Sequence, residues 1–274
     1  MTPAVSTVAF DGYPFEVAFD ELAALGVERI EPAFIRGYTD FDESTFSEGR
    51  AQRLGRALET RGLRVQGLSA HMDLAAEDAD AMLARRIGFA QVLGARILIT
   101  NAGPEAGRTA ILRQIETAIP ALEAAGITLA LENPGHGRGD LIGQGEQGAA
   151  LVAELDAPHV RLNVDVGNLL TYAGAAEPGL SAAVPFAAHA HLKEIAEDGP
   201  DWRFAPLGEG LVDWPAVAGV VRRLAPGLPV ALELPLRLRR PGRADPVRAK
   251  EALPLAVIRD ALRLSLAGWA QASG

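Results

Sequence analysis

Eight short apolar segments alternate along this chain with longer segments that have helical periodicity. The apolar segments are rich in Val, Ile and Leu, as buried parallel strands are. They lie at residues 5–10, 27–34, 65–71, 96–101, 128–133, 160–166, 188–193 and 229–234. A strand, a helix and a further strand form a βαβ unit, and eight such units in one run predict strands that close into a ring inside a layer of helices.

The segments between the predicted strands have the features of amphipathic helices. Between the fourth and fifth strands, apolar residues recur at helical spacing, at Ile111, Ile115, Ala118, Ile119 and Leu122. Several helices are expected to end in a left-handed glycine, at Gly26, Gly62, Gly94 and Gly126. Near the end of the chain, we expect a short helix to begin at Asp245-Pro246 and a longer one to follow Pro254.

The length of the chain fits one such barrel. With 274 residues it is close to the roughly 250 that are typical of the fold, and no linker divides it. We therefore predict an α/β protein in which residues 1–274 form a single (β/α)8 TIM barrel. An open, doubly wound sheet is the alternative, but no Gly-x-Gly-x-x-Gly follows the first strand.

Charge and composition exclude several kinds of partner. The formal net charge of −9 argues against nucleic acid, because nucleic-acid-binding proteins usually present a basic face. The chain has no cysteine, so any metal must bind to oxygen and imidazole. The N-terminal segment MTPAVSTVAFDG lacks the basic start and apolar run of a signal peptide, and no apolar stretch has membrane-spanning length. We expect a cytoplasmic protein without a membrane partner.

Polar residues stand near the ends of the predicted strands, where this fold places its active site. If the inward faces carry them, three carboxylates and one imidazole converge from four successive strands: Glu132, Asp165, His191 and Glu233. This set suits one Mn²⁺ ion, with Mg²⁺ or Co²⁺ as alternatives, better than a closed zinc site. A buried ion-pair network without metal is the structural alternative.

Several short segments carry a family resemblance. ALENPGHG, LNVDVGN, HAHLKE and ALELP, together with LSAHMDL and PLGEGLVDW, resemble the xylose-isomerase-like barrel superfamily over nearly the whole chain. That superfamily contains sugar isomerases, ketose 3-epimerases, inosose and dehydroshikimate dehydratases and apurinic endonucleases. The resemblance implies that Glu132, Asp165, His191 and Glu233 bind the catalytic metal, and that Glu132 and Glu233 also exchange protons with the substrate.

The same resemblance implies a set of substrate contacts. We expect five residues to contact the substrate: His71, Asn168, Lys193, Arg203 and Glu31. Glu31 has loop capping as its alternative role. Family epimerases often carry a histidine where this chain has Asn168 and a glutamate where it has Arg138, and these departures argue against a standard free-ketose 3-epimerase.

Two further groups of residues are given less direct roles. His189 lies deeper on its strand than His191, so we expect it to be a hydrogen-bonded core residue. Four arginines follow the eighth strand, where many barrels bind a phosphate: Arg237, Arg239, Arg240 and Arg243. We expect them to be solvated or to contact another subunit, with an acidic or phosphorylated substrate as the alternative.

These observations favour a metal-dependent sugar isomerase or epimerase that transfers protons on a keto-sugar, or on a related polyol or acid, through an enediolate. A dehydratase of the inosose or dehydroshikimate type and the barrel subunit of a sugar lyase are the alternatives. A DNA-repair endonuclease is disfavoured by the acidic charge and by the small number of histidines, which is five. The expected partner is a small sugar-like molecule, and the resemblance implies a homodimer.

Overall fold

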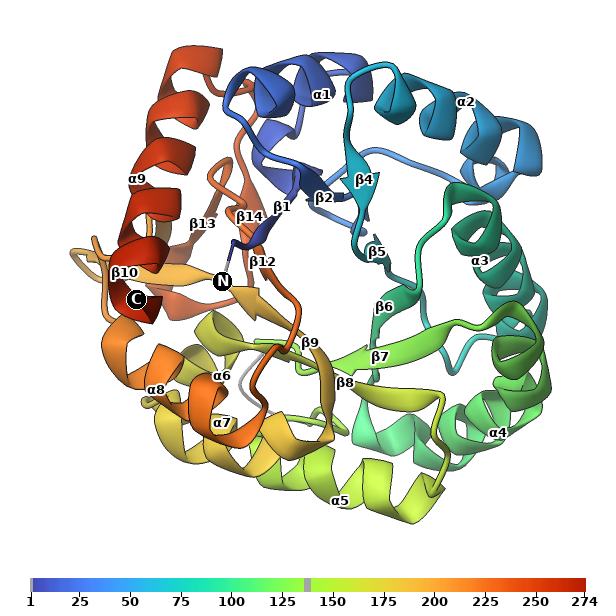
Figure 1. The fold of residues 1–274 in the computed structure, drawn as a ribbon. Coiled ribbons are helices and arrows are strands. Elements are labelled where there is room, and N and C mark those ends of the chain that lie inside the picture. Colours follow the sequence, from blue (N-terminus) through green and yellow to red (C-terminus); the bar gives the residue numbers. More distant parts are fainter. Residues whose placement is uncertain (1, 136–138) are drawn as a thin grey trace.

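The computed structural model describes residues 2–135 and 139–274 and confirms the predicted barrel. Its helices surround a central ring of strands (Figure 1). The first strand, β1 (Ala4–Ser6), pairs in parallel with β2 (Arg29–Glu31) on one side and with β12 (Val230–Leu232) on the other. The first and last strands of the barrel are therefore hydrogen-bonded to each other, which closes the ring and excludes an open sheet.

The parallel sheet contains ten strand segments because the second and third predicted strands are each interrupted. Pro32, which has no N–H to donate, separates β2 from β3 (Ala33–Phe34). The next position around the ring is likewise divided into β4 (Arg64–Val65) and β5 (Leu68–Ala70), and β2 pairs with β4 as β3 pairs with β5. The uninterrupted strands that follow are β6 (Ile97–Asn101), β7 (Thr128–Glu132), β8 (Val160–Asp165) and β9 (Ala187–Leu192).

Helices follow the strands in the expected order. They are α1 (Phe15–Ala24), α2 (Glu48–Glu59), α3 (Ala79–Leu93), α4 (Arg108–Ala125), α5 (Gly145–Leu155), α6 (Val166–Ala173), α7 (Glu177–Ala183), α8 (Trp214–Leu224) and α9 (Leu255–Ser273). Short 3₁₀ helices are η1 (Thr7–Phe10), η2 (Glu43–Phe46), η3 (Glu105–Gly107), η4 (Val184–Phe186) and η5 (Pro241–Arg243). The four predicted capping glycines all have positive φ angles: Gly26, Gly62, Gly94 and Gly126. In the described part of the chain, none of the helices combines the length and apolar character that crossing a bilayer requires.

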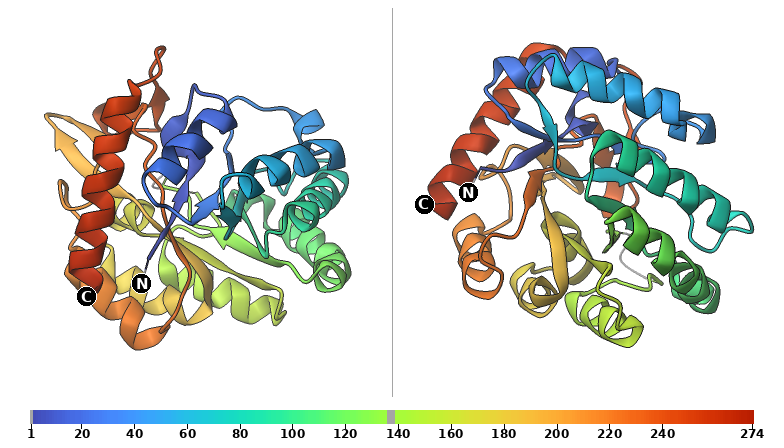
Figure 2. Two further views of the ribbon diagram at one scale, coloured as in Figure 1. Left: turned by 45° about the horizontal axis from the view of Figure 1, so that its top comes forward. Right: turned by 45° about the vertical axis from the view of Figure 1, so that its right-hand side comes forward.

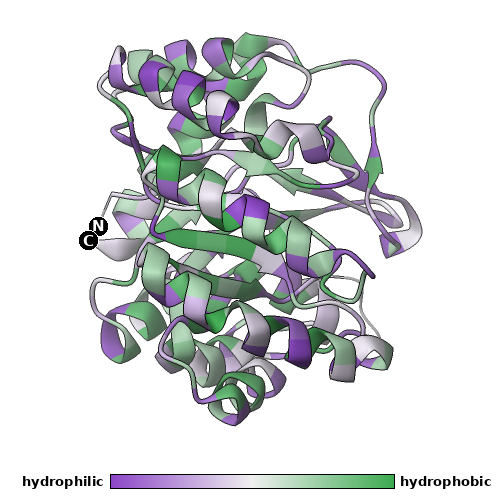
Figure 3. Ribbon diagram, turned by 90° about the vertical axis from the view of Figure 1, so that its right-hand side faces the viewer, coloured by the Kyte–Doolittle hydropathy of each residue, from purple (hydrophilic) through white to green (hydrophobic). Residues whose placement is uncertain are grey.

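The hydrophobic core lies between the strand ring and the helices. Central strands are largely hydrophobic, whereas the helices also carry hydrophilic residues (Figure 3). The helix α4 buries Ile111, Ile115, Ala118 and Leu122, so its predicted apolar face is confirmed. Both chain ends lie close together in the views of Figures 1 and 2.

A second, four-stranded antiparallel sheet was not predicted. It consists of β10 (Glu194–Asp198), β11 (Asp201–Ala205), β13 (Leu238–Arg240) and β14 (Val247–Arg248). The β10–β11 hairpin extends from the barrel on the side of α9 (Figure 2). These strands follow β9 and β12 in the chain, so the sheet stands at the end of the barrel where the active site is expected.

The expected short helix at Asp245-Pro246 is wrong. Residues 247–248 instead form β14, which pairs with β13. The guanidinium of Arg248 is held 2.6 Å from Asp11 and 2.7 Å from Asp40, and these ion pairs attach the strand to the start of the chain. The longer helix does begin after Pro254, as expected.

A close approach of two helices provides a test of the packing. At Gly145, the first residue of α5, an added Cβ would lie 1.7 Å from the carbonyl oxygen of Gly179 in α7. We expect Gly145→Ala to lower the free energy of unfolding by about 1–3 kcal/mol, because the backbones must move apart. Gly55→Ala is the control, since no atom lies within 4 Å of its added Cβ in α2. That change should raise the free energy of unfolding by roughly 0.5–1 kcal/mol. Urea denaturation measures both, and equal effects would contradict this packing.

Candidate active site

The four predicted metal ligands converge at one end of the barrel. Glu132 ends β7, Asp165 ends β8, His191 lies in β9, and Glu233 directly follows β12. One ligand atom from each residue lies within 4.8 Å of those of the other three. All four side chains are buried, with at most 2% of their surface exposed. Parallel strands with adjacent carboxyl ends therefore produce the cluster that the strand order predicts.

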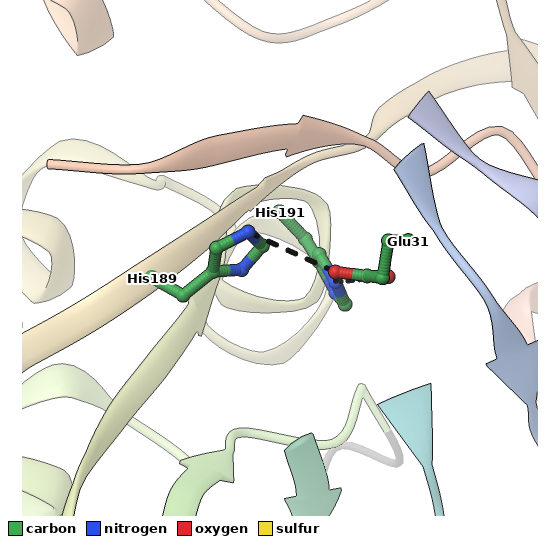
Figure 4. Close-up of side chains that lie close together, drawn as sticks. All are labelled: Glu31, His189 and His191. Carbon is green, nitrogen blue, oxygen red and sulfur yellow. Dashed lines mark hydrogen bonds and ion pairs between the residues drawn. The ribbon is translucent and has the colours of Figure 1, made fainter. Parts of the chain in front are cut away.

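Hydrogen bonding orients the imidazole of His191. Its Nε2 lies 3.0 Å from Oε1 of Glu31. Figure 4 shows these two side chains next to each other. Its Nδ1 faces the carboxylates, at 3.2 Å from Oε2 of Glu132 and 3.4 Å from Oε2 of Glu233. Histidines that bind a metal commonly donate their other ring nitrogen to a carboxylate. Nδ1 of His191 is therefore the candidate ligand atom, and Glu31 is the residue that orients it.

A second polar layer lies deeper in the barrel. His189 is fully buried, and its Nδ1 lies 2.9 Å from Oδ1 of Asn163. The Nδ2 of Asn163 in turn donates to Oε2 of Glu132 over 2.7 Å. His189 thus has the hydrogen-bonded core role expected from its depth. The ring of His189 also lies near Glu31, with its Nε2 3.7 Å from Oε2; Figure 4 shows the two side chains together. This deeper layer therefore contacts the carboxylates of both Glu31 and Glu132.

Lys193 lies directly against two of the candidate ligands. Its Nζ is 2.6 Å from Oδ2 of Asp165 and 2.6 Å from Oε2 of Glu233. Burial alone would lower the pKa of Lys193, but these carboxylates raise it well above its ordinary value, so the amine is charged. Burial also raises the pKa of Asp165 to about 6, although the charge of Lys193 opposes this shift.

The pKa values of the Glu31 and Glu132 carboxylates depend on the neighbouring His191. Burial alone would raise the pKa of Glu31, but the charge of His191 and its hydrogen bond hold it at about 2. Burial alone would raise the pKa of Glu132 as well, but the charge of His191, its hydrogen bond and the effect of His71 together lower it. Burial would lower the pKa of His191, but the surrounding carboxylates raise it well above its ordinary range. The cluster therefore retains a proton on its imidazole to offset crowded negative charge, and a divalent cation supplies the same compensation.

The donor set fits a divalent ion that prefers oxygen. Three carboxylates and one imidazole match Mn²⁺, Mg²⁺ or Co²⁺, and they leave room in the coordination shell for oxygens of another molecule. A second group, Glu31 with His189 and His191, is also close enough to hold an ion. None of these three residues lines the main cavity, however, whereas Glu132 and Glu233 of the first group do. The first group is the candidate metal centre.

A cavity of about 410 Å³ stands over this centre. Glu132 and Glu233 line it, whereas Asp165 and His191 are not among its lining residues. Three of the expected substrate contacts are also on its wall: His71, Asn168 and Lys193. The two carboxylates assigned to proton transfer are thus the two candidate ligands that face the cavity.

Two expected substrate contacts lie elsewhere. Glu31 is fully buried and hydrogen-bonded to His191 and Ser69, and it does not line the cavity. Arg203 is in the middle of β11 and is likewise not a lining residue. Arg138 lies outside the described residues. The structure thus places Glu31 behind the metal centre and Arg203 in the antiparallel sheet.

His71 is available to a bound molecule. It is 7% exposed, and neither of its ring nitrogens has a hydrogen-bond partner in the described part of the chain. Burial lowers its pKa, so the ring is neutral and offers one donor and one acceptor. Its Nε2 lies 3.7 Å from Oε2 of Glu132. A ligand in the cavity can complete the hydrogen bonding of this ring.

Tyr38 and Arg240 also line the cavity. The sequence did not single out Tyr38, and it gave Arg240 contact with an acidic or phosphorylated substrate only as an alternative role. Burial raises the pKa of Tyr38 to about 12, so its phenol is neutral. The expectation that Arg240 is solvated is wrong, since only 4% of its surface is exposed. Tyr38 follows the strand that carries Glu31, and this position after a strand is the one signal that could have identified it.

Comparison with known proteins identifies the family. The model of the xylose isomerase-like TIM barrel family matches residues 19–255, which is most of the chain. The protein belongs to this family, as its sequence motifs predicted. No curated protein matches the chain in sequence.

Solved structures share the fold along the whole chain. A D-psicose 3-epimerase with D-tagatose from Clostridium cellulolyticum H10 has a TM-score of 0.77 at 13% identity, over 100% of this chain and 99% of that one. A xylose isomerase-like TIM barrel protein from Mycobacterium smegmatis in complex with magnesium has a TM-score of 0.73 at 18% identity, over 100% and 98%. The probable 3-DHS dehydratase AsbF from Bacillus anthracis has a TM-score of 0.68 at 16% identity, over 96% and 98%. At these identities the likeness shows the fold.

The contact between Glu31 and His191 can be tested by metal binding. Glu31→Gln preserves shape but removes the charge that accepts from Nε2 of His191. We expect Mn²⁺ affinity to fall 10–100-fold, the usual cost of losing such a partner, as measured by calorimetry on metal-free protein. Ser69→Ala is the control, because it removes only the neutral 3.0 Å contact to Glu31 and should have a smaller effect. Wild-type affinity in Glu31→Gln would show that Glu31 does not orient the ligand.

Proposed function

We propose that this protein is a divalent-metal-dependent isomerase or epimerase that transfers a proton on a keto-sugar, or on a related polyol or acid. One observation carries the proposal: Glu132 and Glu233 belong to the candidate metal centre and also line the cavity above it. Asp165 and His191 belong to the same centre but do not line the cavity. This difference supports a role in holding an ion for Asp165 and His191, and an additional role in reaching a substrate for Glu132 and Glu233.

A bound ion, Mn²⁺ by preference, supplies Lewis-acid polarisation of a substrate carbonyl and so acidifies the adjacent carbon. One carboxylate, Glu132 or Glu233, then takes the proton from that carbon, and the substrate becomes an enediolate. Both carboxylates are held in place, Glu132 by Asn163 over 2.7 Å and Glu233 by Lys193 over 2.6 Å. Positioned groups of this kind need little rearrangement during proton transfer.

Where the proton returns decides the product. Return to the opposite face of the same carbon gives the epimer, and return to the neighbouring carbon interconverts aldose and ketose. Because β7 and β12 lie on different sides of the ring, Glu132 and Glu233 can approach a substrate from different directions. This arrangement supports a pair in which one carboxylate removes the proton and the other returns it.

A dehydratase is the second candidate function. In that reaction the same enediolate expels a neighbouring hydroxyl, which needs a proton as it leaves. His71 supports this alternative, because its ring nitrogens have no other partner among the described residues and Nε2 lies 3.7 Å from Glu132. A conjugated enone absorbs in the ultraviolet and an isomeric sugar does not, so absorbance during turnover separates the two functions.

Metal dependence is the first test of the proposal. We expect EDTA to abolish proton exchange between ketoses and D₂O, followed by proton NMR, and Mn²⁺, Co²⁺ or Mg²⁺ to restore it. Asp165→Ala and His191→Ala should lose the ion but keep the circular-dichroism spectrum, because both residues lie at the strand ends. Full activity in protein shown to be metal-free by elemental analysis would refute this proposal.

The paired carboxylates are the second test. Glu132→Gln and Glu233→Gln should each lower turnover by roughly 10²–10⁴-fold, the usual contribution of a general acid or base. One of the two variants can retain exchange of a substrate proton with D₂O without net product. Glu123→Gln, on the exposed face of α4, is the matched control and should leave turnover unchanged. If either site variant keeps near-normal turnover with metal still bound, the paired-glutamate mechanism is wrong, and Lys193 or His71 becomes the candidate for proton transfer.

A further inference from the structure

The guanidinium of Arg240 lies in the cavity wall, and no carboxylate of the described residues is within ion-pair distance of it, although Asp165 and Asp245 act on its charge from farther away. The residue ends β13 and is only 4% exposed. Its Nε donates to the carbonyl of Ala244 over 2.7 Å, and its Nη2 donates to the carbonyl of Gly135. Within the described residues, Nη1 has no hydrogen-bond partner and no carboxylate forms an ion pair with this side chain. A buried charge in this state is costly unless something else neutralises it.

The neighbouring arginines show that this condition is particular to Arg240. Arg237 pairs with Asp11 over 3.1 Å. Arg239 pairs with Asp198 over 3.2 Å, and Arg243 pairs with Glu197 over 2.9 Å. Of the four arginines that follow the eighth barrel strand, Arg240 alone lacks a carboxylate in the part of the chain that the structure describes. It is also the one that lines the cavity.

A short path connects Arg240 to the metal centre along the cavity wall. A Cβ added to Gly135 would lie 3.0 Å from Nη1 of Arg240 and 2.7 Å from Oδ1 of Asn168, so these two atoms flank the same backbone position. Oδ1 of Asn168 is 3.5 Å from Nζ of Lys193, which contacts Asp165 and Glu233. A molecule of single-sugar length can therefore extend from the carboxylates to Nη1.

Tyr38 lies beside the same path. It lines the cavity together with Lys193, Glu233 and Arg240, and the charges of these three residues act on its phenol. No hydrogen bond occupies its hydroxyl in the described residues, and the high pKa keeps the hydroxyl a donor. Arg240 and Tyr38 thus give the cavity wall two donors, one charged and one neutral.

We propose that the substrate is an anion: a keto-sugar that carries a carboxylate or a phosphate at the end remote from the reacting carbons. This inference rests on the proposed function. Nη1 of Arg240 binds an oxygen of the anionic group, and the hydroxyl of Tyr38 donates a second hydrogen bond to it. The cavity of about 410 Å³ accommodates one sugar acid or sugar phosphate. The bound anion supplies the counter-ion that Arg240 lacks.

The test compares ligands that differ only at that end. D-fructose, D-fructuronate and D-fructose 6-phosphate share their first five carbons and carry a hydroxymethyl, a carboxylate and a phosphate at the sixth. Calorimetry measures their affinity for Mn²⁺-loaded protein, and proton NMR in D₂O measures exchange. We expect at least one anionic member to bind at least about 10-fold more tightly than fructose, and the better anion identifies the group.

Variants assign that preference to Arg240. Arg240→Met should weaken binding of the preferred anion by roughly 10–100-fold, the range for a hydrogen bond to a charged group, and leave fructose unchanged. Tyr38→Phe should weaken the same ligand by a smaller factor. Arg239→Met is the matched control, since this neighbouring side chain is exposed and paired with Asp198, and it should change neither affinity. If Arg240→Met does not fold, Arg240→Lys retains a charge and should retain part of the preference.

The outcomes separate this inference from the proposed function. Two outcomes overturn the anion site even if fructose exchanges its proton. One is that the anions bind no better than fructose, and the other is that the full preference persists in folded Arg240→Met or, if that variant does not fold, in Arg240→Lys. Conversely, Arg240-dependent binding of an anion without exchange in any of the three compounds supports the anion site and counts against proton transfer on such sugars.

Discussion

The carboxylates of Glu31, Glu132, Asp165 and Glu233 crowd together at one end of the barrel, and their mutual repulsion is costly unless nearby positive charge balances it. Lys193 and a protonated His191 provide that balance in the absence of an ion, through contacts of 2.6 to 3.4 Å. Under the proposed function, a divalent cation at this place would supply the same compensation.

The rest of the site is built around that balance. The deeper layer of His189, Asn163 and Glu31 orients Glu132 and His191 of the candidate metal centre. Above it, the cavity exposes only the two glutamates of the centre, while the antiparallel sheet places Arg240 in the cavity wall. Under the proposals made above, this layered arrangement would separate three tasks: holding an ion, transferring a proton and recognising the far end of a substrate.

Local signals account for most of what could be predicted. Strand periodicity and capping glycines identified all eight barrel strands, because both depend on residues close together in the chain. Unusual charged residues at strand ends identified the four-residue cluster. The predicted helix at Asp245-Pro246 was wrong because Arg248 binds Asp11 and Asp40, more than 200 residues away in the chain, and no local pattern records such a contact.

The sequence by itself determined the fold class, the order of the strands and the residue types available at their ends, because these follow from periodicity and from the cost of burying charge. Tertiary structure alone decided which faces those residues occupy. Glu31 reaches His191 only because the ring closes and brings β2 near β9. Arg239 and Arg240 are identical in type and adjacent in the chain, yet Arg239 is exposed and Arg240 is buried. Neighbouring residues of a strand point to opposite faces of the sheet. Only the packing of the sheet against the barrel decides which of the two faces meets the cavity.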